Sequence, residues 1–96
     1  MHWFINVTIE TSTYVLKAEC LFINHQIEQI KITGEGVSIV LESNRPLLTE
    51  LGLDKPVHWK IIKGKLRDST ALERITKALE ISLKEPGEGQ QFSNLK

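Results

Sequence analysis

The feature that most constrains the fold is an alternation of apolar and polar side chains over residues 2–9. Apolar residues occupy one side of this run, and Phe4 is the one large apolar residue on the other side. The apolar set comprises Trp3, Ile5, Val7 and Ile9. Because successive side chains of a strand point to opposite faces, a period of two predicts a β-strand with one buried face.

Three more runs with strand character follow at residues 14–23, 27–32 and 37–41, separated by short turn-prone segments. These connections are too short to join parallel strands, which need about a dozen intervening residues, so we expect an antiparallel meander. The run 14–23 becomes apolar on both faces toward its end, which predicts a central strand. The isoleucines of the run 27–32 share one face only if a bulge resets the phase, so the register of this strand stays open.

Two helices are predicted in the second half of the chain. The first covers residues 46–51, where a proline suits the first turn and Gly52 can end the helix in a left-handed conformation. The second covers residues 70–84, where Thr70 and Glu73 have the spacing of a capping box. Its apolar stripe consists of Leu72, Ile75, Leu79 and Leu83. Each helix therefore has a start signal and an apolar face with which to dock.

Between the helices, residues 57–62 alternate apolar and polar side chains and predict a fifth strand, with Trp59 as the largest candidate for the core. The predicted fold class is α+β: a five-stranded, mainly antiparallel sheet in the order β-β-β-β-α-β-α, with the C-terminal helix packed on one face. Residues 1–85 are expected to form a single domain. Residues 86–96 hold few apolar side chains and are expected to be a flexible C-terminal tail.

Composition limits the possible functions. A chain of 96 residues has one core with little stability to spare, so we expect any function to be exercised on a surface. One cysteine, Cys20, excludes an internal disulfide, and the three histidines are not spaced like metal ligands. No nucleophile motif, carboxylate pair or phosphate-binding loop is recognisable, so we expect no cofactor, no metal and no enzymatic activity. The lack of a long apolar segment predicts no membrane span and a cytoplasmic protein.

The formal net charge of zero hides an uneven distribution. Residues 1–43 carry five acids and two bases, whereas residues 44–77 carry eight bases and four acids. The basic segment 55–67 interleaves cations with His58 and Trp59, which is typical of a surface that binds an anionic ligand or single-stranded nucleic acid. The candidate residues for such a site are Arg45, Lys60, Lys63, Lys65 and Arg67.

The same basic segment also fits the solvent-exposed edge of a sheet. Lysines on an edge strand discourage pairing with another chain. Alternation supports this interpretation, because Trp59 and Ile61 point away from Lys60. The sequence leaves both interpretations open.

The leading functional hypothesis is a non-enzymatic protein-interaction module, whose partner is another protein or a second copy of the chain. Several strands carry apolar side chains opposite their main apolar stripe, namely Phe4, Leu21, Ile23, Val40 and Ile62. On an uncovered sheet face these residues would form a partner surface or a homodimer interface, and an edge strand offers a second route to a dimer. Binding of an anionic ligand or nucleic acid through residues 55–67 is the alternative hypothesis.

One stretch resembles a pattern found in small single-domain bacterial proteins of unknown function. The stretch is Ser43-Asn44-Arg45-Pro46-Leu47-Leu48, followed by a strand at Trp59-Lys60 and a capped C-terminal helix. The resemblance covers residues 14–84 and is structural, because it consists of a cap, a proline-started helix and a core tryptophan. It implies a compact α+β fold and carries over no functional residue.

Overall fold

The chain forms a meander of four strands, a short helix, a fifth strand and a long helix. A computed structural model describes residues 1–66 and 69–84. The elements are β1 (His2–Ile9), β2 (Ser12–Ile23), β3 (Glu28–Gly34), β4 (Val37–Ser43), α1 (Arg45–Leu51), β5 (Trp59–Lys63) and α2 (Ser69–Lys84). This order confirms the predicted α+β class and its antiparallel sheet. Arg67 and the predicted tail 86–96 lie outside the described residues.

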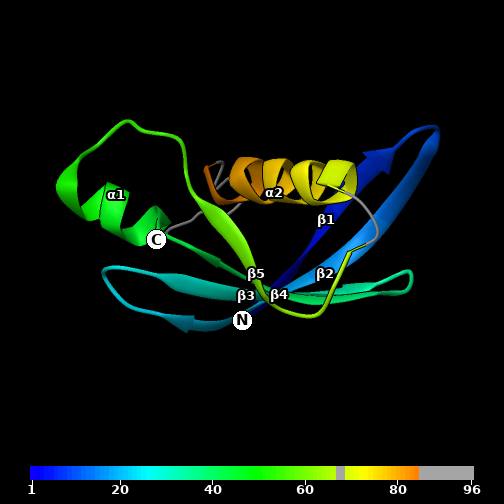
Figure 1. Cartoon of the computed structure of the whole chain (residues 1–96), viewed down its shortest axis with the longest axis horizontal. Coiled ribbons are helices and arrows are strands. Elements are labelled where there is room, and N and C mark those ends of the chain that lie inside the picture. Colours follow the sequence, from blue (N-terminus) through cyan, green and yellow to red (C-terminus); the bar gives the residue numbers. More distant parts are fainter. Residues whose placement is uncertain (67–68, 85–96) are drawn as a thin grey trace.

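The five strands follow the order β1-β2-β3-β4-β5, and every neighbouring pair is antiparallel (Figure 1). Each strand therefore pairs with its neighbours in the sequence, as expected for strands joined by short turns. Gly34 and Gly36 have positive φ in the turn between β3 and β4, a conformation that glycine adopts readily. A consequence of this order is that β1 and β5 are the two edges of the sheet.

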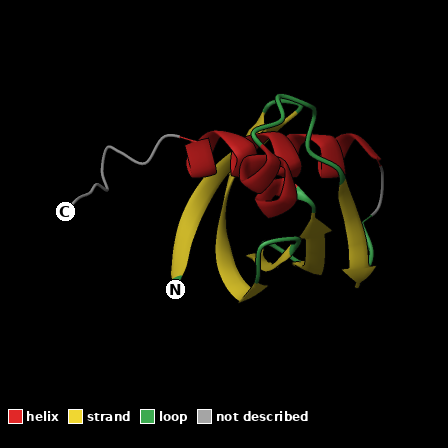
Figure 2. Ribbon diagram, turned by 90° about the vertical axis from the view of Figure 1, so that its left-hand side faces the viewer, coloured by secondary structure: helices red, strands yellow, loops and turns green. Residues whose placement is uncertain are grey.

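Both helices lie on one side of the curved sheet (Figure 2). α2 packs mainly on β1 and contributes two fully buried side chains, Ile75 and Leu79. The core consists of Ile5, Val7, Leu16, Ala18, Ile30, Ile32, Ile39, Leu41, Ile75 and Leu79. The opposite side of the sheet carries no other element among the described residues. We call it the helix-free face.

A bulge interrupts β2 rather than β3. The register runs from Cys20 opposite Ile30 to Phe22 opposite Gln29, so Leu21 is the extra residue, whereas β3 pairs with β4 without interruption. The bulge shifts the phase of the end of β2 by one residue. Phe22 therefore lies on the opposite face of the sheet from Cys20. The bulge considered for the third strand therefore lies in the neighbouring strand, β2.

The helix ends agree in part with the sequence signals. Gly52 ends α1 in the left-handed conformation with φ 67°, as predicted, and Pro46 lies in the first turn. Asn44 is the N-cap, but its side chain makes no capping hydrogen bond. α2 begins at Ser69, so Thr70 lies inside the first turn instead of before it. The predicted capping box of Thr70 and Glu73 is therefore wrong, because Thr70 is a helical residue and not the N-cap.

Candidate functional site

The free edge of β1 is the most regular exposed feature of the sheet. β1 pairs with β2 through all eight of its residues, without a bulge. Its sequence, HWFINVTI, contains no proline, no lysine and no acidic residue. Edge strands usually carry such features to prevent pairing with other chains, so within residues 1–66 and 69–84 β1 is an edge without these protections.

One backbone hydrogen bond shows which groups of β1 point outward. The amide of Cys20 donates to the carbonyl oxygen of Met1 at 3.2 Å, and these two residues are opposite in the register that continues from β1. In an antiparallel pair, hydrogen-bonded and non-hydrogen-bonded positions alternate. The odd residues of β1 therefore bond to β2. The N–H and C=O groups that face away from the sheet are those of His2, Phe4, Asn6 and Thr8.

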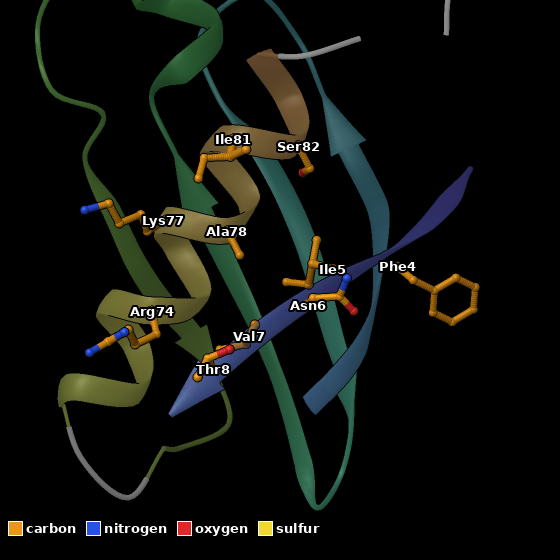
Figure 3. Close-up of a pocket in the computed structure, with 10 residues that line it drawn as sticks. All are labelled: Phe4, Ile5, Asn6, Val7, Thr8, Arg74, Lys77, Ala78, Ile81 and Ser82. Atoms are coloured by element: carbon orange, nitrogen blue, oxygen red, sulfur yellow. The ribbon is translucent and has the colours of Figure 1, made fainter. Parts of the chain in front are cut away.

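A groove of about 390 Å³ runs between this edge and α2 (Figure 3). Trp3 Nε1 donates to Ser82 Oγ at 3.1 Å and ties one end of β1 to the helix. Along β1 the lining includes the buried side chains of Ile5 and Val7, while Phe4 points away from α2. The helix contributes Arg74, Lys77, Ala78, Ile81 and Ser82. The groove thus combines outward backbone groups, an apolar floor and a polar rim.

The two flanks of α2 carry opposite charges. Arg74 and Lys77 line the groove from the helix side, with side chains that point away from β1 (Figure 3), and the residues that line the groove include no acid. The flank beside β5 presents Glu73 and Glu80, and Glu80 Oε2 accepts a hydrogen bond from Trp59 Nε1 at 2.8 Å. The helix-side rim of the groove is therefore cationic, on a chain of zero net charge.

The edge at β5 is built differently. β5 has five residues, and its register with β4 shifts between Leu41 opposite Ile61 and Val40 opposite Lys63, which leaves Ile62 as a bulge. Lys60 lies 3.6 Å from Glu42 on the neighbouring strand. Short length, lysines and a bulge are the usual protections of an edge strand. This geometry favours the interpretation of the basic segment 55–67 as a sheet edge that lysines protect from pairing.

An ion pair between a buried carboxylate and a half-buried guanidinium joins the start of β3 to the start of α1. The Glu28 carboxylate, 1% exposed, accepts two hydrogen bonds from Arg45, each at 2.7 Å, and one from Ser43 Oγ at 2.9 Å. The hydrogen bond to Glu28 raises the pKa of Arg45, against the lowering effect of burial. Because two charge-assisted hydrogen bonds join the guanidinium to the Glu28 carboxylate, the pair fixes α1 to the sheet.

The structure does not bring the predicted anion-binding cations together. Arg45 is committed to Glu28, and Lys60 lies beside Glu42. Lys63 is opposite Val40, and Lys65 lines a separate hollow that also contains Glu10 and Glu35. Arg67 lies outside the described residues. The four described cations therefore form no common patch.

The five predicted interface residues are also dispersed. Phe4, 63% exposed, and Val40, 9% exposed, lie on the helix-free face, where lysines occupy the positions opposite both of them. Ile23 is opposite the buried Glu28 and so lies on the helix side. The remaining two, Leu21 and Ile62, are the extra residues of the two bulges. No continuous apolar surface joins them in the described structure.

Sequence reasoning missed the basic flank of α2 and the partner of Glu28. Arg74, Lys77 and Ile81 have helical spacing, but only the packing of α2 shows which strand they adjoin. Glu28 precedes Ile30 and Ile32 at the same parity, which marks an acid on the core side of a strand. That signal indicates a buried carboxylate, although it does not identify Arg45.

Comparisons of the chain with protein-family models, curated proteins and solved structures find no match. Within the described ranges, no helix has the length and apolar character needed to cross a membrane. The same ranges contain no cluster of three side chains suited to hold a metal ion.

Proposed function

We propose that this chain is a protein-interaction module that binds an extended segment of a partner along the free edge of β1. In this mode the partner adds a strand to the sheet, main-chain hydrogen bonds supply affinity and alternate side chains supply specificity. The single observation that carries the proposal is the outward alignment of the backbone groups of Phe4, Asn6 and Thr8 beside the groove.

Two further features support the β1 edge over the rest of the surface. α2 lies along the edge and supplies a wall, so a bound strand would contact side chains as well as backbone. Ile81, 53% exposed, and Ala78 give this wall apolar character. A groove formed by a strand edge and a helix buries an added strand on one face, which a bare edge does not.

The alternative, binding of an anionic ligand through residues 55–67, has less support. Its described cations are separated or paired with acids. Surface lysines that neighbour carboxylates offer little net attraction to a phosphate. We therefore retain the interaction module as the proposed function.

A selection experiment tests this proposal without knowledge of the partner. A library of random twelve-residue peptides displayed on phage is selected on the full chain, and the enriched peptides are measured on Asn6→Pro and Asn6→Ser. Proline removes an outward amide and places its ring at the edge, so affinity should decrease at least about tenfold. Serine keeps the amide and should bind within about twofold of the parent. Enriched peptides that bind Asn6→Pro as well as the parent would contradict the proposal.

A further inference from the structure

The cationic groove beside β1 indicates the chemistry of the partner. Building on the proposed function, we propose that the segment bound along β1 is an acidic extended stretch of a different protein. The rim of the groove carries Arg74 and Lys77, and none of its lining residues is acidic. Opposite charges arranged across an interface select partners and raise association rates.

The direction of α2 places the charge and the apolar surface at different ends of the groove. Trp3 is tied to Ser82 at one end, whereas Val7 and Ile75 line a common hollow near the other. Arg74 therefore lies near the Thr8 end of β1 and Ile81 near the Phe4 end (Figure 3). α2 thus runs antiparallel to β1.

This direction predicts a side-chain pattern in the bound segment. Partner residues opposite Ile5 and Val7 point toward α2, because directly paired residues of adjacent strands share a face. The residue opposite Val7 is expected to be Asp or Glu, near Arg74. The residue opposite Ile5, two positions away, is expected to be apolar and to contact Ala78 and Ile81. An acid and an apolar residue separated by one position therefore define the expected motif.

A second copy of the chain fits the groove poorly. The sequence of β1 contains no acidic residue that could face Arg74 or Lys77 in a β1–β1 pair. A two-fold arrangement would also bring the same cationic flank of α2 from each copy toward the shared edge, which is unfavourable between like charges. The charge of the groove therefore favours a different protein over a homodimer.

Two synthetic peptides test the charge preference on the full chain. One has threonine at odd positions and alternating glutamate and valine at even positions over ten residues, and the control has lysine for glutamate. In fluorescence anisotropy at low salt, the glutamate peptide should bind at least about tenfold more tightly than the lysine peptide. Replacing both cations (Arg74→Gln with Lys77→Gln) should weaken the glutamate peptide about three- to tenfold. Added salt should weaken it as well.

A matched variant removes the same charge from the other edge of the sheet. Lys60→Gln with Lys63→Gln should leave the affinity of the glutamate peptide within about twofold. Equal loss in the two double variants would overturn the inference, because the preference would then follow net charge instead of the groove. Equal binding of both peptides to the parent, with loss on Asn6→Pro, would also overturn it while leaving the proposed function intact.

Two remaining outcomes separate this inference from the proposed function. Sedimentation of the parent as a dimer that Asn6→Pro converts to a monomer would assign the edge to a second copy and overturn the acidic partner. The proposed function itself would be overturned if neither synthetic peptide binds and the selected peptides bind Asn6→Pro with the affinity that they have for the parent. Both proposals would be supported if the peptides enriched by selection contain the motif of an acid and an apolar residue and bind more weakly to Asn6→Pro than to the parent.

Discussion

β1 and β5 are the two edge strands of the same sheet, and they differ in length, in regularity and in lysine content. β1 is eight residues long, regular and free of lysine, whereas β5 is five residues long, carries Lys60 and Lys63 and contains a bulge at Ile62. One edge is protected against pairing and the other is open. This difference supports the proposal that a partner strand binds at β1 and not at β5.

The two edge strands also differ in how many of their backbone N–H and C=O groups point outward. The amide of Asn44 donates to the carbonyl oxygen of His58, its register partner at the end of β4. The outward groups of β5 are therefore those of Trp59 and Ile61, and the bulge ends the series. On β1 the outward series continues over four residues, from His2 to Thr8. A partner strand can form a continuous ladder on β1 and cannot on β5.

The largest expected effect concerns neighbouring positions of β1. Val7 is 2% exposed and bonds to β2, whereas Asn6 is exposed and faces outward. Val7→Pro should destabilise the fold by about 3–5 kcal/mol, because it removes a buried side chain and an inner ladder bond. Asn6→Pro should cost less than about 1.5 kcal/mol. Urea unfolding of both variants, with Val7→Ala to isolate the packing loss, measures the difference. Similar losses for the two prolines would contradict the assigned phase.

The ion pair between Glu28 and Arg45 should affect stability without affecting the groove. Arg45→Met leaves the Glu28 carboxylate buried without its main partner and should cost about 3 kcal/mol. The midpoint temperature of thermal unfolding should then decrease by about 10–20 °C for a domain of this size. The double variant Glu28→Gln with Arg45→Met should recover part of the loss, because no buried charge remains. Weakened peptide binding by folded Arg45→Met would show that the junction between β3 and α1 also shapes the β1 edge.

An added charge should make β1 resemble β5. Phe4 and Asn6 lie outside the core on the helix-free face, so Asn6→Lys places a lysine on the edge without disturbing buried residues. Lysine at an edge opposes strand addition, so affinity for selected peptides without an acidic residue opposite Asn6 should decrease about three- to tenfold, while stability changes by less than about 0.5 kcal/mol. Anisotropy and urea unfolding measure the two quantities. Undiminished affinity would mean that bound peptides do not pair along β1.

The smallest effect is expected at the protected edge. Lys60 is well exposed and its distance to Glu42 is 3.6 Å, so Lys60→Ala should lower stability by less than about 1 kcal/mol. Peptide affinity should be unchanged, because the substitution lies on the opposite edge. A large loss of stability would indicate that the Lys60–Glu42 pair contributes more to the β5 edge than an exposed pair usually does.

The strands were predictable from sequence because their side chains alternate and their connections are short. Trp3, Ile5 and Val7 identify the face of β1 that packs against α2, and the short turns predict the meander that makes β1 an edge. The bulge in β2 was not predictable, because Leu21, Phe22 and Ile23 are all apolar and no alternation marks the phase. Local patterns therefore identify elements more reliably than their registers.

The candidate site was only partly predictable. The sequence suggested an interaction through an edge strand, but it directed attention to the cations of residues 55–67, which the fold separates. Arg74 and Lys77 were visible as helical residues, yet their place beside β1 depends on contacts between segments about seventy residues apart. The groove arises from packing, and packing is not encoded in any single segment.

Amide hydrogen exchange tests the difference between the two edges most directly. In the free protein, the amides of Phe4, Asn6 and Thr8 should exchange rapidly and those of Ile5 and Val7 slowly. A saturating selected peptide should slow the three outward amides of β1 at least about tenfold and leave those of Trp59 and Ile61 in β5 unchanged. Protection at β5, or bound peptide without protection of the β1 amides, would contradict the account.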